Sequence, residues 1–180
     1  MGHCFGTQSR QSNRPGRLVT HFGIAALATA MWFAPALAFG QSFSIGRQFT
    51  GTQLSTAPSG RIPPDTMGAV GPNHVAELIN TSFAVYDKNG GLQTRVSLDS
   101  FWNTAFANSG AGTTANFAFD PRIIYDPASS RWYAAAVDTR DSANSRVLIG
   151  VTTGSDPSTS NWRGFAFDAD ASDQRWADFP

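Results

Sequence analysis

Residues 122–167 contain four short segments of strand-forming residues separated by turn signals, and this pattern restricts the fold more than any other feature. Two of these segments, 133–137 and 147–151, are apolar on both faces instead of alternating between apolar and polar residues. A strand of this kind must be covered on both sides. Because stacked four-stranded sheets provide such cover, we expect an all-β chain built from antiparallel β-propeller blades, with a β-sandwich as the alternative.

The preceding residues predict a second unit of the same kind. Strands are expected at 75–79, 82–86 and 92–98, and a strong turn signal, DKNGG, separates the last two. Residues 100–107 indicate a helical turn, and no amphipathic helix is expected between the strands of the later unit.

The first 38 residues have the pattern of a secretory signal peptide. Residues 1–17 contain three arginines and no acid, residues 18–33 form a largely apolar run, and Ala36 and Ala38 are small residues suited to cleavage. The run of about 16 residues is shorter than the ~20 that a membrane-spanning helix needs. We therefore expect cleavage near Ala38, no membrane span afterwards, and a protein secreted to the periplasm, the cell surface or the medium.

Cleavage would leave a chain without cysteine and with a small excess of acid. The only cysteine is Cys4, so neither disulfides nor thiolate zinc sites are expected in the mature protein. The loss of three arginines leaves ten basic residues against 13 acidic ones, a net charge of about −3. An acidic surface does not attract phosphate backbones, and no nucleic-acid partner is expected.

Residues 39–60 are rich in Ser, Thr, Gly and Gln and are expected to form a flexible N-terminal arm, with one strand over 43–49. Residues 61–180 form the β-propeller-like domain. At about 45 residues per blade, the mature chain supplies about three of the 4–8 blades that propellers use. We expect this domain to be incomplete at its C-terminal end, as the N-terminal part of a longer protein. If Pro180 is the true C-terminus, closure would require oligomerisation.

Candidate functional residues lie mostly in turns next to expected strands. Loop carboxylates at the strand entrances of a propeller can face its central channel, and a pair of carboxylates can cleave a glycosidic bond. Turn capping is the competing explanation for each aspartate, and His74 is expected to be a surface residue of a turn. No catalytic residue is assigned, since sequence spacing does not show which groups converge. The candidates for facing a ligand are Asp65, His74, Asp120, Arg122, Asp126 and Asp178.

Two further sets of residues have alternative interpretations. Asp168, Asp170 and Asp173 are closely spaced oxygen ligands of the kind that calcium prefers, but they lack the glycine and glutamate of an EF-hand loop. A solvated acidic loop is the competing explanation, and no other cofactor is expected. Four tryptophans could stack on sugars, although packing between sheets is the more common use of this residue. They are Trp102, Trp132, Trp162 and Trp176.

Several segments resemble a family of bacterial secreted proteins. The segments are PPDTMGAVGPNHVAELINTSFAVYDKNGG, FDPRIIYDPASSRWYAAAVD, LIGVTTGSDPSTSNW and the terminal WADFP, so the resemblance covers about residues 63–180. Members of that family are predicted β-propellers, most without an assigned activity, and some end in surface-sorting or adhesion-type modules. In them the WADFP-like segment opens a further blade. The resemblance implies an extracellular propeller more than it implies a reaction.

These observations favour a secreted or cell-surface β-propeller module with a binding or structural role, whose ligand is a glycan or a protein. The alternative is part of an extracellular propeller glycoside hydrolase or polysaccharide lyase that uses loop carboxylates. Convergence of loop aspartates, at least one with a raised pKa, would favour the enzyme. A third hypothesis is a surface protein stabilised by calcium.

Overall fold

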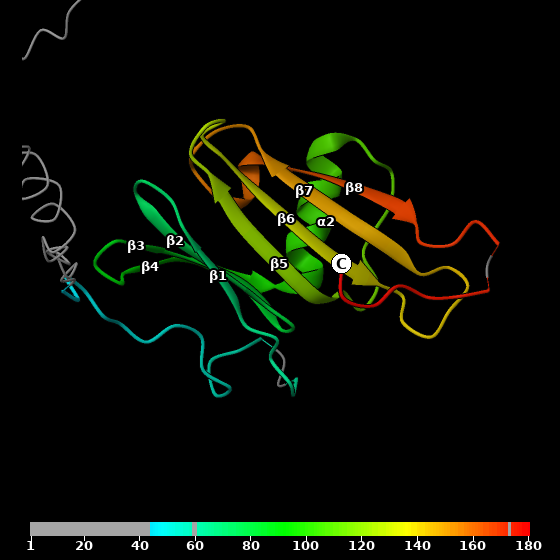
Figure 1. The fold of residues 1–180 in the computed structure, drawn as a ribbon, viewed down its shortest axis with the longest axis horizontal. Coiled ribbons are helices and arrows are strands. Elements are labelled where there is room, and N and C mark those ends of the chain that lie inside the picture. The colour runs from blue at the N-terminus through cyan, green and yellow to red at the C-terminus, as the bar shows by residue number, and fades with distance from the viewer. Residues whose placement is uncertain (1–43, 59–60, 173) are drawn as a thin grey trace, which may run out of the picture. The chain divides into compact units, whose positions relative to one another are not determined.

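Two four-stranded antiparallel sheets make up most of the structure, which is a computed structural model (Figure 1). The structure describes residues 44–58, 61–172 and 174–180, and Ile45–Pro180 form one compact unit. The predicted signal peptide lies outside the described residues. The prediction of an all-β chain with four-stranded antiparallel sheets is confirmed.

Sheet A contains β1 (Met67–Val70), β2 (His74–Ile79), β3 (Ser82–Asp87) and β4 (Leu92–Ser97), hydrogen-bonded in that order. Each strand pairs antiparallel with the next along the chain. The turn between β3 and β4 has the predicted chemistry, because the Asp87 carboxylate accepts hydrogen bonds from two backbone N–H groups of that turn. These bonds, led by the one from Gly91, lower the pKa of Asp87.

Sheet B repeats this arrangement. It contains β5 (Phe119–Asp126), β6 (Arg131–Asp138), β7 (Arg146–Thr152) and β8 (Trp162–Asp168), again in sequential order. A short 3₁₀ helix, η2 (Thr159–Asn161), precedes β8. The strands predicted in this unit are all present, each within a few residues of its expected position.

The helical turn expected at 100–107 is instead a helix of 12 residues, α2 (Leu98–Ser109), between the two sheets in sequence. Its N-terminus is capped by the Ser97 side chain, which accepts a hydrogen bond from the backbone N–H of Ser100 at 3.1 Å. Gly110 ends the helix in the left-handed conformation, with φ of 69°. The helix buries five residues on one face: Leu98, Phe101, Trp102, Ala105 and Phe106.

The strand expected at 43–49 is absent from 44–49, the part of that range that the structure describes. The arm instead contacts sheet A through side chains. The Phe49 ring lies 5.2 Å from that of Tyr86, and the Thr52 N–H donates to the Glu77 carboxylate at 2.9 Å. A side chain of sheet A therefore satisfies the backbone N–H of Thr52 without a strand ladder.

One core is shared by both sheets and α2. Trp132 and Trp162 of sheet B and Trp102 of α2 are fully buried, which confirms packing as the role of these three tryptophans. Two glycines permit close approach. A Cβ at Gly164 of β8 would lie 2.9 Å from Phe106 of α2, and one at Gly71 would lie 2.4 Å from Trp132.

The opposite face of sheet B is apolar and exposed. Ile149 pairs with Phe165 across β7 and β8, so both project from the same face. The exposed fractions are 59% for Ile124, 37% for Ile149, 45% for Phe165 and 55% for Phe167. Monomeric proteins seldom leave several large apolar side chains together in solvent.

Candidate functional site

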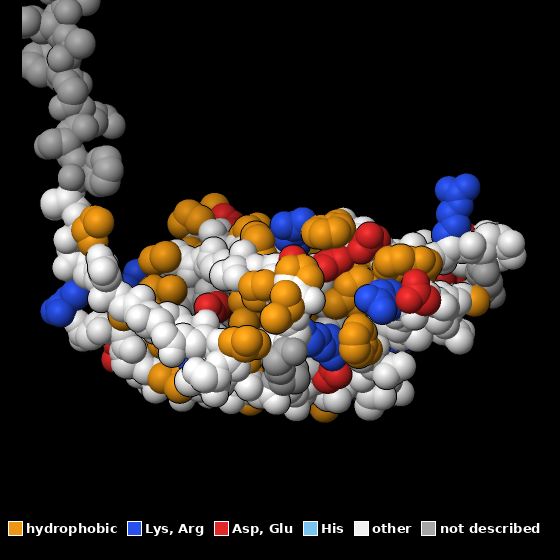
Figure 2. All heavy atoms as spheres, turned by 90° about the horizontal axis from the view of Figure 1, so that it is seen from below, with side chains coloured by type: hydrophobic (Ala, Val, Ile, Leu, Met, Phe, Trp, Pro, Cys, Tyr) orange, Lys and Arg blue, Asp and Glu red, His pale blue; other side chains and the backbone are white. Residues whose placement is uncertain are grey.

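Three of the predicted aspartates meet in one cleft. Asp65 precedes β1, Asp120 is near the start of β5, and Asp178 lies in the C-terminal segment, yet all three line a cavity of about 580 Å³. The face of the molecule in Figure 2 carries hydrophobic, acidic and basic side chains side by side. Stacking of the two sheets brings together residues that are more than fifty positions apart in sequence.

Asn80 connects the first two of these aspartates. Its side-chain amide donates to the Asp65 carboxylate and to the Pro63 carbonyl, and its side-chain oxygen accepts the N–H of Asp120 at 2.7 Å. The backbone N–H of Phe179 donates to the Asp120 carboxylate at 3.4 Å, which brings in the C-terminal segment. The buried amide of Asn80 thus fixes the segment before β1 against the start of β5.

The pKa of Asp120 is raised to about 6. Burial is the largest cause, followed by a hydrogen bond with the Asp178 carboxyl group, while the N–H of Phe179 acts in the opposite direction. A weaker bond with Asp65 and the negative charge of Asp178 raise it further. A hydrogen bond between two carboxyl groups requires a proton, so the cleft retains one at mildly acidic pH.

This shift predicts how stability depends on pH. An ordinary aspartate titrates near 3.8, so between about pH 3.8 and 6 the folded site keeps a proton that the unfolded chain has released. The contribution of Asp120 is full below that range and is lost as the pH rises through about 6. Asp120→Asn cannot titrate, so the melting temperature of the wild type should fall relative to this variant between pH 4 and pH 7. A difference that stays constant over that range would contradict the predicted shift.

Residues with strained backbone conformations are concentrated around this cleft. Seven non-glycine residues of the described chain have positive φ, and four of them line the cleft: Asp65 (43°), Phe117 (59°), Asp120 (48°) and Phe179 (47°). Two more, Thr139 and Asp141, flank Arg140, which also lines the cleft. Aspartate adopts such a conformation more readily than most residues, but for Phe117, Phe179 and Thr139 it is costly, and strained residues tend to cluster where a protein positions side chains for function.

Aromatic and cationic side chains form the rest of the cleft wall. Phe117, Trp176 and Phe179 are 43%, 38% and 60% exposed there. The guanidinium carbon of Arg61 lies 3.7 Å from the centre of the Phe117 ring, and that of Arg140 lies 5.8 Å from it. Trp176, alone among the four predicted tryptophans, is placed where it could stack on a ligand.

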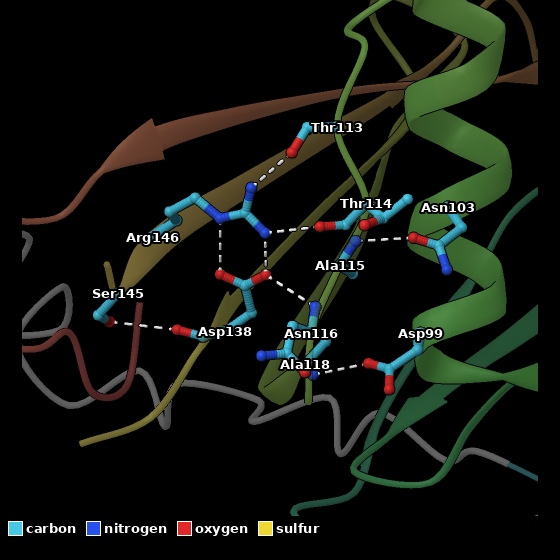
Figure 3. A network of polar contacts seen from close by, with 10 residues as sticks. All are labelled: Asp99, Asn103, Thr113, Thr114, Ala115, Asn116, Ala118, Asp138, Ser145 and Arg146. Atoms are coloured by element: carbon cyan, nitrogen blue, oxygen red, sulfur yellow. Dashed lines mark hydrogen bonds and ion pairs between the residues drawn. The ribbon is translucent and has the colours of Figure 1, made fainter. Parts of the chain in front are cut away.

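A buried ion pair holds the loop that carries Phe117 (Figure 3). The Asp138 carboxylate, fully buried at the end of β6, binds the Arg146 guanidinium through two hydrogen bonds. Arg146 also donates to the Thr113 hydroxyl at 2.7 Å and to the Thr114 carbonyl at 2.8 Å. Asp138 in turn accepts the N–H of Asn116 at 3.1 Å, so the pair fixes both ends of residues 113–116.

Helix α2 supports the same loop from its first two turns. The side chain of Asn103 accepts the N–H of Ala115, and that of Asp99 accepts the N–H of Ala118, both at 2.7 Å (Figure 3). The backbone N–H groups of the residues on either side of Phe117, Asn116 and Ala118, therefore both have hydrogen-bond partners. This helix, of which the sequence predicted only a turn at 100–107, is part of the support of the cleft.

The other candidate residues lie elsewhere. Asp126 is the last residue of β5, where the Ser129 hydroxyl and N–H groups of the following turn bind its carboxylate and lower its pKa. His74 is the first residue of β2, not part of a turn, and is separated from Asn80 by the length of that strand. Arg122 lies beside the cleft, where it donates to the Pro180 carbonyl at 3.4 Å.

The predicted calcium ligands make turn contacts. Asp168 accepts the N–H of Asp170, whose own carboxylate accepts the hydroxyl and N–H of Ser172, with the hydroxyl bond contributing most to its lowered pKa. Asp173 lies outside the described residues. Within the part of the chain that the structure describes, no group of three or more His, Cys, Asp or Glu side chains is arranged to hold a metal ion.

Comparison of the chain with protein-family models, with curated proteins and with solved structures found no match. Among the described residues, no helix is long and apolar enough to cross a membrane. The inference about function therefore depends on the cleft and its chemistry.

Proposed function

We propose that this protein is a secreted or cell-surface β-propeller module that binds a glycan in the cleft of Asp65, Asp120 and Asp178. The convergence of these three carboxyl groups, from segments far apart in sequence, carries the proposal. The concentration of strained residues around the cleft supports it independently.

The composition of the cleft suits a sugar. Carboxylate oxygens can accept hydrogen bonds from hydroxyl groups, while exposed rings such as Trp176 and Phe179 can pack against the apolar faces of pyranose rings. A volume of about 580 Å³ is within the ~300–1,000 Å³ of ordinary small-ligand sites. A protein ligand has less need of a concave site lined by carboxyl groups.

The arrangement of the sheets supports the propeller. Strand β1 lies beside β5, so the first strands of the two sheets are neighbours, as they are around the axis of a propeller (Figure 1). Sheet A uses apolar residues such as Phe83 and Val85 to pack in the shared core. The exposed apolar face of sheet B, with Ile149 and Phe165, would receive the next blade in the same way.

Asp120 favours hydrolysis as the second candidate function. A glycoside hydrolase needs one protonated carboxyl group beside an ionised one, and burial together with Asp178 raises the pKa of Asp120 to about 6. Loop aspartates that converge, at least one with a raised pKa, are the arrangement that was expected to favour an enzyme. In that case Asp120 would protonate the oxygen of the leaving sugar, and an ionised aspartate of the cleft would activate the water that attacks the sugar carbon.

The test is a glycan array followed by calorimetric titration of the oligosaccharides retained. We expect Asp65→Asn and Asp178→Asn to weaken binding at least about 10-fold, a typical effect of losing a charged hydrogen bond. Asp126→Asn is the matched control, since Asp126 caps a turn outside the cleft. Absence of binding, or equal loss in the control, would refute the proposal. Release of new reducing ends by the wild type but not by Asp120→Asn would establish hydrolysis.

A further inference from the structure

If the cleft binds a glycan, as proposed above, its side chains also indicate which class of sugar it binds. We propose that one end of the cleft is a subsite for a carboxylate-bearing sugar, a uronic acid, held by Arg61 and Arg140 beside the Phe117 ring. The acidic end, with Asp65, Asp120 and Asp178, binds the hydroxyl groups of the same chain.

Arg61 is the more firmly placed of the two arginines. Its guanidinium carbon lies 3.7 Å from the centre of the Phe117 ring, and its Nη1 donates to the Ala118 carbonyl at 2.9 Å. Ala118 is fully buried and is itself bound by Asp99. A guanidinium has five N–H donors, so this bond and the contact with the Phe117 ring hold the group in place and leave further donors for a ligand.

Arg140 is held through its backbone more than through its side chain. The preceding residue, Thr139, donates its N–H to the Asn116 carbonyl at 2.9 Å, which ties this loop to the one that carries Phe117. The side chain pairs only with its neighbour Asp141, at 3.1 Å, and both side chains are more than half exposed. Because such surface pairs are worth little, Arg140 can exchange Asp141 for a ligand carboxylate at small cost.

The charges of the cleft are separated instead of neutralised. Arg61 and Arg140 share the cavity with three aspartates, yet the ion pairs of the described chain are Arg140–Asp141 and Arg146–Asp138. With a neutral sugar, the ion pairs of the described chain would give Arg61 no carboxylate partner and Arg140 only the exposed carboxylate of Asp141. A uronate carboxylate fits it, because a guanidinium binds carboxylates through two parallel hydrogen bonds.

The experiment compares each acidic oligosaccharide with its own carboxyl-reduced form. The probes are oligomers of galacturonate, of glucuronate-containing disaccharide units and of mannuronate. Each probe is compared with its carboxyl-reduced, neutral product of the same stereochemistry. All are titrated calorimetrically into the full chain. We expect at least one acidic form to bind at least about 10-fold more tightly than its reduced partner. Raising the salt concentration should narrow that difference, because screening weakens the attraction.

Variants then assign the preference to the two arginines. Arg61→Gln and Arg140→Gln should each reduce the preference for the acidic form, while Arg131→Gln, at an exposed arginine that does not line the cleft, should preserve it. Asp178→Asn should weaken the binding of the acidic and the carboxyl-reduced oligosaccharides equally. Melting temperatures show whether each variant is folded.

The outcomes separate this inference from the function on which it rests. Equal binding of acidic and reduced forms, or a preference that survives both arginine variants, would overturn the uronate subsite and leave glycan binding standing. Failure of every acidic, reduced and neutral oligosaccharide to bind would overturn both.

Discussion

Replacing Asp138 with asparagine is expected to lower the free energy of unfolding by about 3–5 kcal/mol, the usual cost of removing one partner from a buried ion pair. Asp138 is fully buried and binds Arg146 through both carboxylate oxygens. Its loss would leave the Arg146 charge without its partner and would release the N–H of Asn116. The measurement is urea unfolding monitored by tryptophan fluorescence. Because total stability is typically about 5–15 kcal/mol, the variant should unfold at far lower urea concentration.

Asp141→Asn is the matched control for that experiment. It removes the carboxylate of the exposed pair with Arg140 and keeps a residue type that tolerates the positive φ at this position. The expected cost is at most about 1 kcal/mol. If the two variants were equally stable, the Asp138–Arg146 pair would not be the support of the loop at 113–118. Asp138→Asn should also weaken glycan binding, since that loop positions Phe117.

Replacing Trp162 with alanine should destabilise the fold by about 3–5 kcal/mol, as is typical when a large aromatic side chain is deleted from a core. Trp162 is fully buried, its ring centre lies 5.1 Å from that of Phe101 and 5.9 Å from that of Phe83, and its N–H donates to the Pro157 carbonyl. It therefore connects β8 to both α2 and sheet A. Thermal and urea unfolding would measure the loss.

Trp176→Ala provides the contrast. This tryptophan is 38% exposed at the cleft, so its removal should cost about 1 kcal/mol or less in stability. It should nevertheless weaken the binding of a glycan, because the ring is placed to stack on one. The reverse order of the two stability losses would contradict the assignment of Trp162 to the core and Trp176 to the site.

The sequence could predict the strands because their signals are local. Apolar runs and turn residues such as Asp87 and Asp126 act within a few positions, and the structure forms those turns by the expected carboxylate contacts. Helix α2 was predicted only as a helical turn at 100–107, although its full length also has a local signal. Its buried residues follow the helical spacing of three and four positions, but polar residues and small side chains between them resemble a loop.

The cleft could be predicted only in part. Asp65, Asp120 and Asp178 were candidates, as were Asp126 and His74, and nothing in their local sequence distinguishes the three that meet. Convergence depends on how two sheets stack, which is a long-range property. Asn80, Arg61, Phe117 and Arg140 had no comparable signal, because their roles arise from hydrogen bonds and ring contacts across 15 to 57 positions, together with backbone strain at Phe117.

The packing of α2 against β8 has a consequence for synthesis. The helix is complete once residue 109 has been made, but the strand that covers it begins at Trp162 and includes the close contact at Gly164. At about 5–20 residues per second, the ribosome needs several seconds to synthesise the chain from residue 110 to the end of that strand. During this interval Phe101, Trp102 and Phe106 lack part of their final cover, and the nascent chain exposes an apolar surface that a holding chaperone would recognise.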